Sequence, residues 1–99
     1  MTRWRLSPKA RREMAAIWHY TADSWGVDQA ERYITQIEHD LSAAAAGSPL
    51  VRPIADYLRI SSGRHVCVFR RDSEGTVVVV RVLHQSQDIP ARLRDDRSS

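Results

Sequence analysis

The sequence predicts an α+β domain, ordered β-α-α-β-β-β, in which an N-terminal helical hairpin covers one face of an antiparallel sheet. The first half of the chain repeats apolar residues at spacings of three and four, the periodicity of amphipathic helices. The second half contains short valine- and isoleucine-rich segments separated by glycine-containing turns, which is typical of strands. Helices grouped together and strands grouped together favour α+β. A chain of 99 residues is expected to form one domain, residues 1–99.

The N-terminal part is predicted to be a short strand followed by the first helix. Trp4 and Leu6 alternate with arginines, which favours a strand with its apolar side inward. Ser7 is a good N-cap and Pro8 suits the first helical position, so a helix begins here. Gly26 can adopt the left-handed conformation that ends it. The apolar stripe of this helix is Ala10, Met14, Ile17, Trp18, Thr21 and Trp25.

A second helix is predicted to follow almost immediately. Asp28 and Glu31 have the spacing of a capping box, and the helix stops at Gly47-Ser48-Pro49. Because the connection Gly26-Val27 is so short, the two helices must form an antiparallel hairpin. The stripe of the second helix is Ala30, Tyr33, Ile34, Ile37, Leu41 and Ala44.

Less regular segments complete the C-terminal half. Leu50 to Ala55 is interpreted as an irregular connection, and Tyr57 to Ile60 as a short strand. At the end of the chain we expect one helical turn from Ile89 to Leu93, followed by a frayed tail, Arg94 to Ser99.

The segment between Arg64 and Pro90 is predicted to be a β-hairpin. Its strands are His65 to Arg70 and Thr76 to His84, joined by a polar turn ending in glycine. The second strand is apolar at nearly every position, which indicates cover on both faces. The helices can cover only one face. The other face, carrying either Val77, Val79, Arg81 and Leu83 or the alternate set, is therefore expected to lack cover from its own chain.

Arg81 stands in the interior of this apolar strand. A buried guanidinium without a partner would be very costly, so Arg81 must face solvent, an internal carboxylate such as Asp88, or a partner protein. The sequence leaves the internal salt bridge and the partner contact open.

Composition narrows the class of protein. The formal net charge is +3 and Lys9 is the only lysine, so the basic residues are nearly all arginine, which pairs well with carboxylate or phosphate. The single cysteine, Cys67, excludes an intrachain disulfide and is interpreted as a buried apolar residue in a reducing compartment. No secretory signal or membrane-spanning segment is recognised, so we expect a cytoplasmic protein. No paired Cys/His spacing suggests a metal site, and no cofactor is expected.

A series of short segments follows in a characteristic order along the chain. They are Leu6-Ser7-Pro8-Lys9-Ala10, Ile17-Trp18-His19-Tyr20, Trp25-Gly26, Gln29-Ala30-Glu31-Arg32-Tyr33, Leu58-Arg59, Gly63-Arg64-His65, Arg81-Val82-Leu83-His84, Asp88 and Pro90. In this order the chain resembles the ParE-type toxins of the RelE/ParE superfamily, which belong to type II toxin–antitoxin systems. The resemblance extends from Trp4 to Leu93.

The resemblance implies a cytoplasmic toxin that poisons DNA gyrase as a binding protein rather than an enzyme. It also implies neutralisation by a ParD-like antitoxin, whose acidic, partly disordered tail packs on the toxin's sheet, in a hetero-oligomer that binds operator DNA through the antitoxin. The expected antitoxin contacts are Arg59, Arg64, Val79, Arg81, Leu83 and His84. The expected target contacts are His19, Tyr20, Arg11 and Arg12, of which His19 and Tyr20 fall off the apolar stripe.

RelE-type relatives provide an alternative, because they are ribosome-dependent mRNA endonucleases. Such cleavage needs an acid, a base and cations that stabilise the phosphate. The candidates for these roles are Arg59, Arg64, Arg81 and His84. Gln85 follows His84, no tyrosine occurs up to Asp88, and Phe69 stands where the family often has tyrosine, so the catalytic set is incomplete.

A non-toxic partner or co-repressor subunit is a third hypothesis. For His84 we favour hydrogen bonding to the backbone of the following turn.

Overall fold

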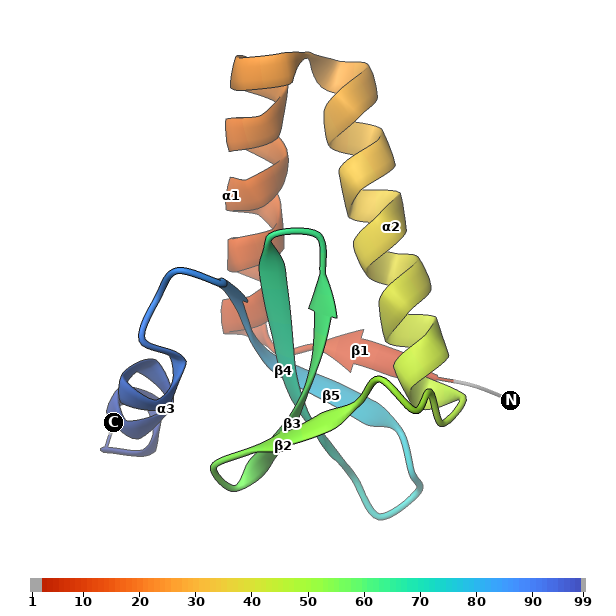
Figure 1. The fold of residues 1–99 in the computed structure, drawn as a ribbon, viewed down its shortest axis with the longest axis vertical. Helices are drawn as coiled ribbons and strands as arrows, with labels where there is room; N and C mark the ends of the chain where they lie inside the picture. Colours follow the sequence, from red (N-terminus) through yellow and green to blue (C-terminus); the bar gives the residue numbers. More distant parts are fainter. Residues whose placement is uncertain (1–2, 99) are drawn as a thin grey trace.

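A five-stranded sheet forms the base of the molecule, and two long helices stand on it as a hairpin (Figure 1). The computed structural model describes residues 3–98, with side chains through Arg94. In chain order the elements are β1 (Trp4–Leu6), α1 (Pro8–Trp25), α2 (Val27–Ala45), β2 (Arg52–Ile54), β3 (Tyr57–Ser62), β4 (His65–Arg71), β5 (Val77–His84) and α3 (Ile89–Ser98). The predicted α+β class and the helical hairpin are confirmed.

Helix α1 begins and ends at the predicted signals. The Ser7 hydroxyl accepts the Ala10 N–H at 3.1 Å, which satisfies one of the free donors of the first turn. At the other end Gly26 has φ +97°, and its N–H donates to the Ala22 carbonyl at 2.9 Å. The stripes of both helices contribute buried residues, all of which except Ala30 belong to the cluster shared with the sheet. They are Ala10, Met14 and Ile17 of α1, and Ala30, Ile37, Leu41 and Ala44 of α2.

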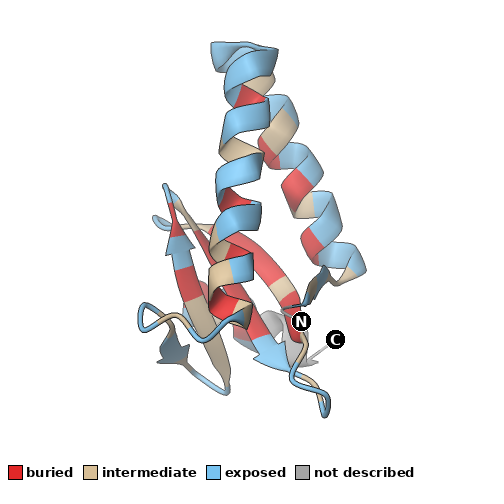
Figure 2. Ribbon diagram, turned by 90° about the vertical axis from the view of Figure 1, so that its right-hand side faces the viewer, coloured by how far each residue is buried: buried red, intermediate tan, exposed pale blue. Residues whose placement is uncertain are grey.

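Two predictions about the tip of the hairpin are wrong. Helix α2 begins at Val27 without a side-chain cap, so Asp28 and Glu31 form no capping box. The Glu31 carboxylate instead accepts the indole N–H of Trp18 at 3.2 Å. Trp25 lies on the predicted core stripe but is 74% exposed. The hairpin extends beyond the sheet, as Figure 2 shows by the pale blue of its far end, so the last turn of α1 has no strand to pack against.

The strands follow the spatial order β1-β5-β4-β3-β2. All neighbours are antiparallel except β1, which runs parallel to β5, so the prediction of an antiparallel sheet holds for β2 to β5. The prediction of an irregular connection in this region missed β2, whose residues pair with β3. This strand contains Pro53, which suits an edge position. With only three residues, it is too short to show an alternation of apolar and polar side chains in the sequence.

A β-bulge in β5 decides which valines face the hairpin. The register shifts between Val68 and Phe69, which pair with Arg81 and Val79, so that Val80 is the extra residue on β5. The alternation of side chains therefore changes phase in the middle of the strand. The buried cluster beneath the hairpin contains Val77, Val79 and Val82, whereas Leu83 belongs to the cluster on the opposite face and Val80 packs against it. The prediction that Val77, Val79, Arg81 and Leu83 share one face is wrong for this reason.

Helix α3 covers the second face of the sheet, which was predicted to have no cover from its own chain. Ile89 and Leu93, which are 5% and 1% exposed, join Val66, Val68 and Leu83 in a second buried cluster. The helix is also longer than the single predicted turn, because it continues through the expected frayed tail to Ser98. Ser99 lies outside the described residues.

Cys67 lies in the hairpin-side cluster and is completely buried, which confirms its interpretation as a small apolar residue. Burial raises the pKa of its thiol to about 12. The thiolate is the reactive form of cysteine, so this side chain is inert in the folded protein.

Candidate functional site

A groove of about 990 Å³ lies between the outer half of the helical hairpin and the turn that joins β3 to β4. We call it the hairpin groove. The side chains that give it its character are Ile17, Tyr20 and Trp25 of α1, Tyr33 of α2, Arg64 and His65 at the start of β4, and His84 at the end of β5. Its walls are therefore largely aromatic or aliphatic, and its basic groups lie on the sheet side.

Tyr33 holds the floor of the hairpin groove together. Its hydroxyl lies 2.6 Å from His65 Nδ1, accepts the Arg64 N–H at 3.0 Å and lies 3.4 Å from the Ser62 carbonyl. Gly63 has φ +57°, and a Cβ there would lie 2.6 Å from the Tyr33 ring, so the turn requires glycine. Burial raises the pKa of the Tyr33 hydroxyl and lowers the pKa of His65, with His84 adding to the latter shift. Both groups are therefore neutral at pH 7.

His84 is fixed by the turn that follows β5. Its Nδ1 accepts the Ser86 N–H at 3.1 Å and lies 2.7 Å from the Ser86 hydroxyl, while its own backbone N–H donates to Gln87 at 2.7 Å. The backbone contact predicted for this histidine is present. Because Nδ1 accepts, the neutral ring carries its proton on Nε2. The ring packs edge-on against His65, with centroids 5.3 Å apart.

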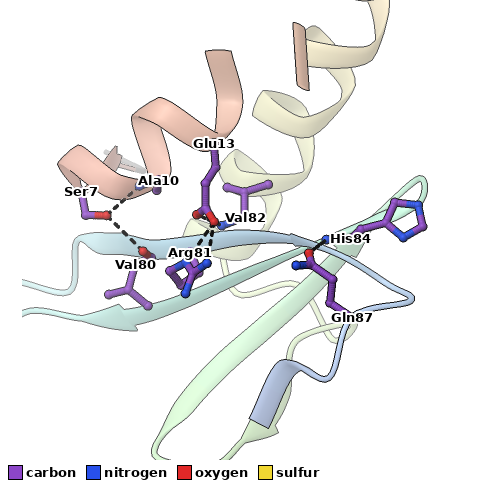
Figure 3. A network of polar contacts seen from close by, with 8 residues as sticks. All are labelled: Ser7, Ala10, Glu13, Val80, Arg81, Val82, His84 and Gln87. Carbon is purple, nitrogen blue, oxygen red and sulfur yellow. Dashed lines mark hydrogen bonds and ion pairs between the residues drawn. The ribbon is translucent and has the colours of Figure 1, made fainter. Parts of the chain in front are cut away.

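A second polar cluster lies where α1 crosses the edge of β5 (Figure 3). One oxygen of Glu13 accepts from Arg81 Nε at 3.0 Å and lies 2.8 Å from Arg81 Nη2. The other oxygen accepts the Val82 N–H at 2.9 Å, and the Ser7 hydroxyl donates to the Val80 carbonyl at 3.1 Å. These contacts satisfy edge groups of β5 beyond the end of β1. The internal salt bridge considered for Arg81 is present, but its partner is Glu13 and not Asp88.

The four candidate RNase residues do not converge. Arg59 and Arg81 both pair with Val68, whose side chain belongs to the α3-side cluster. Residues directly opposite one another share a face, so these two arginines lie on the α3 side of the sheet. Arg64 and His84 line the hairpin groove on the other side.

Two of the expected antitoxin contacts are not on the surface. Val79 is completely buried beneath the hairpin, and Leu83 is 2% exposed beneath α3. The sequence could not separate them from surface positions, because the bulge and α3 are both tertiary features. Arg81 is also largely enclosed, since its side chain is 9% exposed and held by Glu13. Arg59, which is half-buried, and Arg64 and His84 keep exposed surface.

The expected target contacts are all exposed but do not form one site. Tyr20 is 72% exposed and lines the hairpin groove. His19 is exposed beside it and packs against Trp18, with ring centroids 5.2 Å apart. Arg11 and Arg12 are exposed near the start of α1 and do not line the groove.

Sequence reasoning missed three residues that build these sites. Trp25 was assigned to the core, although its position next to the end of the helix is where a stripe can run past the sheet. The sequence marks His65 only as the start of a strand and as part of the segment Gly63-Arg64-His65. Glu13 lies beside the apolar stripe, and nothing in the sequence relates it to Arg81, which is 68 positions away.

Within residues 3–94, no group of three or more His, Cys, Asp or Glu side chains is placed to hold a metal ion. None of the described helices is long and apolar enough to cross a membrane.

Comparison with known proteins identifies the family. Residues 4–89 match the sequence model described as "ParE toxin of type II toxin-antitoxin system, parDE". The chain belongs to the ParE toxin family. It is 41% identical over 96 residues to Toxin ParE1 of Mycobacterium tuberculosis, covering 93% of this chain and 98% of that protein. It is 35% identical over 97 residues to Toxin ParE1 of Caulobacter vibrioides, covering 94% and 99%.

A solved structure agrees on the fold. The chromosomal ParDE toxin–antitoxin system from P. aeruginosa contains a chain that superposes with a TM-score of 0.71. The match covers 85% of this chain and 96% of that one, at 16% identity. The present chain is thus a ParE-type toxin of a type II toxin–antitoxin system with the RelE/ParE fold.

Proposed function

We propose that this ParE-type toxin acts by binding and poisoning DNA gyrase, and that a ParD-like antitoxin neutralises it. We favour binding over catalysis because the candidate RNase residues are divided between the two sides of the sheet. Membership of the ParE family supports the choice of gyrase rather than the ribosome.

Phosphodiester cleavage requires its acid, base and cations around one phosphate. A general acid or base must come within about 2.6–3.2 Å of the atom it serves, directly or through one water. Arg59 and Arg81 lie on the α3 side of the sheet, so they cannot reach a phosphate held by Arg64 and His84 in the hairpin groove. Arg81 is in addition paired with Glu13, which neutralises its charge. This arrangement supports a binding protein.

The same features fit an acidic protein partner. The chain carries a net charge of +3, mostly as arginine, and large aromatic side chains are exposed at the tip of its hairpin. Arginine and aromatic residues are enriched in protein interfaces. The toxin and its antitoxin would act in the cytoplasm as a hetero-oligomer that binds operator DNA through the antitoxin.

The direct test is a supercoiling assay with purified gyrase and purified toxin. We expect added toxin to inhibit supercoiling and to stabilise cleaved DNA, and its induction in cells to raise a DNA-damage response. Normal supercoiling at saturating toxin would refute gyrase as the target.

A translation extract provides the matching test of catalysis. We expect mRNA to stay intact when toxin is added. Cleavage that disappears with His84→Ala would replace the proposal with a ribosome-dependent RNase. Harmless overexpression without antitoxin would instead indicate a non-toxic partner or co-repressor subunit.

A further inference from the structure

A row of arginines crosses the α3 side of the sheet, the side opposite the helical hairpin. Arg59 of β3 and Arg81 of β5 lie on it because both pair with Val68. Arg52 of β2 lies directly opposite Arg59 and therefore shares the same face. The row thus extends from the edge strand β2 to β5.

Two more arginines lie on the α3 side, close to the β4–β5 turn. Arg5 of β1 and Arg70 of β4 both lie directly opposite Val78. The residues before and after Val78 in β5 belong to the hairpin-side cluster, so Val78 itself points to the α3 side, and the two arginines flank it there. Arg71, which donates to the Ala44 carbonyl of α2, is the exception among the strand arginines.

Little negative charge opposes these arginines. None of the five strands contains an aspartate or glutamate. Two of the arginines have carboxylate partners, because Glu13 holds Arg81 and an Asp72 oxygen lies 3.4 Å from Arg5. The others have no carboxylate within ion-pair distance among the described residues, and they are exposed Arg52, half-buried Arg59 and exposed Arg70.

The α3 side offers positive charge without an exposed apolar anchor. Its apolar residues Val66, Val68 and Leu83 are buried beneath α3, and Val78 is only 5% exposed. Among the described residues, the large apolar side chains that are exposed lie on the helical hairpin or in the loop after it; they are Tyr20, Trp25, Val27 and Leu50. Protein interfaces depend on a few buried anchors, whereas interfaces with DNA are more polar and much more positively charged. This side is therefore better suited to a polyanion than to a folded protein.

Duplex DNA fits this surface better than a single strand does. Proteins that hold single strands stack the bases on aromatic rings. The aromatic residue of β3 on this side, Tyr57, is half-buried against the cluster beneath α3. Strands about 4.8 Å apart place the two edge strands roughly 19 Å from each other. A duplex carries one charge per about 1.7 Å of its axis, so arginines spread over this width face several phosphates.

We propose that the arginines on the α3 side of the sheet bind the phosphate backbone of duplex DNA, independently of its sequence. Arg52, Arg59 and Arg70 are the principal contacts, and Arg5 adds a contact from the edge strand β1. Phosphate contacts of this kind position a protein on a duplex without reading its bases. The inference rests on the proposed function, in which the toxin acts on gyrase that holds duplex DNA.

The test measures DNA binding by the purified toxin in the absence of gyrase. Arg59→Gln/Arg70→Gln removes two of the charges, and Arg52→Gln/Arg70→Gln does so at two exposed positions, where folding is least disturbed. Lys9→Gln/Arg32→Gln is the matched control, because it removes the same charge from exposed positions of the helical hairpin. Fluorescence anisotropy of a labelled duplex of about 20 base pairs measures binding, and circular dichroism checks the folding of each variant.

We expect the wild type to bind the duplex with a Kd on the order of 1–100 μM at physiological salt. Its affinity should fall with salt at a log–log slope of about −3, because each phosphate contact contributes about 0.9. Both arginine variants should bind about tenfold more weakly or worse and lose about 2 from the slope, while the control stays within about threefold of the wild type.

Three results would overturn the proposal. The first is equal affinity and equal salt slope in all three variants. The second is tighter binding of a single strand of the same sequence than of the duplex. The third is that the arginine variants keep the duplex but lose the antitoxin, which would assign the α3 side to the antitoxin.

A supercoiling assay separates this inference from the proposed function. If the wild type leaves gyrase unaffected but binds the duplex through Arg59 and Arg70, the DNA-binding surface stands and only the target of the toxin is wrong. If the wild type inhibits gyrase while the arginine variants bind the duplex as the wild type does, gyrase stands as the target and the DNA-binding surface is refuted.

Discussion

The two faces of the sheet are both apolar, yet they are covered in very different ways. Among the described residues, twelve form the buried cluster beneath the helical hairpin, six from α1 and α2 and six from the strands, whereas five form the cluster beneath α3. The hairpin is also tied to the edge of β5 through Ser7 and Glu13, while α3 is attached through Ile89 and Leu93. The helical hairpin therefore buries most of the core, and α3 buries a smaller apolar area on the opposite face.

The difference shows where this small domain keeps exposed apolar surface. The hairpin is longer than the sheet beneath it, so its outer half has an apolar side with no strand to cover it. Helix α3 lies over apolar positions of the opposite face and leaves Arg59 half-buried among them. Stability therefore depends most on the inner half of the hairpin, and exposed apolar surface remains where the hairpin extends beyond the sheet.

The largest expected effect comes from a substitution that opens a cavity beneath the hairpin. Ile37 is completely buried in the first cluster, so Ile37→Ala should lower the free energy of unfolding by about 3–4 kcal/mol. Urea denaturation followed by circular dichroism measures the loss. Ile34→Ala is the neighbouring control on α2, since Ile34 is only half-buried, and should lose clearly less. Equal losses at both positions would contradict a core centred beneath the inner hairpin.

The next largest effect is expected where α1 is tied to β5. Glu13→Ala removes the Glu13 carboxylate from both the Arg81 guanidinium and the Val82 N–H. We expect a loss of about 2–3 kcal/mol, at the lower end for a buried pair because the Glu13 side chain is 21% exposed. Glu13→Gln keeps an oxygen for Val82 and should lose less. If urea denaturation gave the same stability for the wild type and both variants, the contacts of Glu13 with Arg81 and Val82 would not stabilise the fold.

On the α3 side the corresponding truncation should be milder. Leu93 is 1% exposed, but α3 is a terminal helix that can detach without unfolding the sheet. Leu93→Ala is therefore expected to lower stability by about 2 kcal/mol, less than Ile37→Ala. Hydrogen exchange provides the distinguishing measurement, because amides of α3 should exchange much faster while those of β5 change little. Faster exchange throughout β5 would mean that α3 is integral to the core.

The smallest effect concerns pH and the floor of the hairpin groove. Burial, with a contribution from His84, lowers the pKa of His65 below its usual value near 6.5, so the unfolded chain takes up this proton at a higher pH than the folded one. Stability should be fully present above pH 6.5 and decline as the pH falls below it. Urea midpoints at pH 7.5 and 5.5 measure the decline, and it should diminish in His65→Gln. An unchanged decline in that variant would assign it to other groups.

Local signals in the sequence determined much of the fold. The stripes of the helices, Ser7 at the start of α1, Gly26 between the helices and the valine strand all predicted the elements that the structure contains. The family resemblance likewise follows from short local segments. Each of these features depends on neighbours within a few residues, where spacing alone sets which side chains share a face.

Only the tertiary structure decided which of those residues meet. The bulge at Val80 changes the phase of β5, the overhang of the hairpin exposes Trp25, and Glu13 finds Arg81 across the chain. Sequence spacing cannot predict these outcomes, because they depend on the lengths and angles of packed elements. The strand that looked as if it needed a second protein to cover it is covered by α3, and the uncovered surface lies on the hairpin instead.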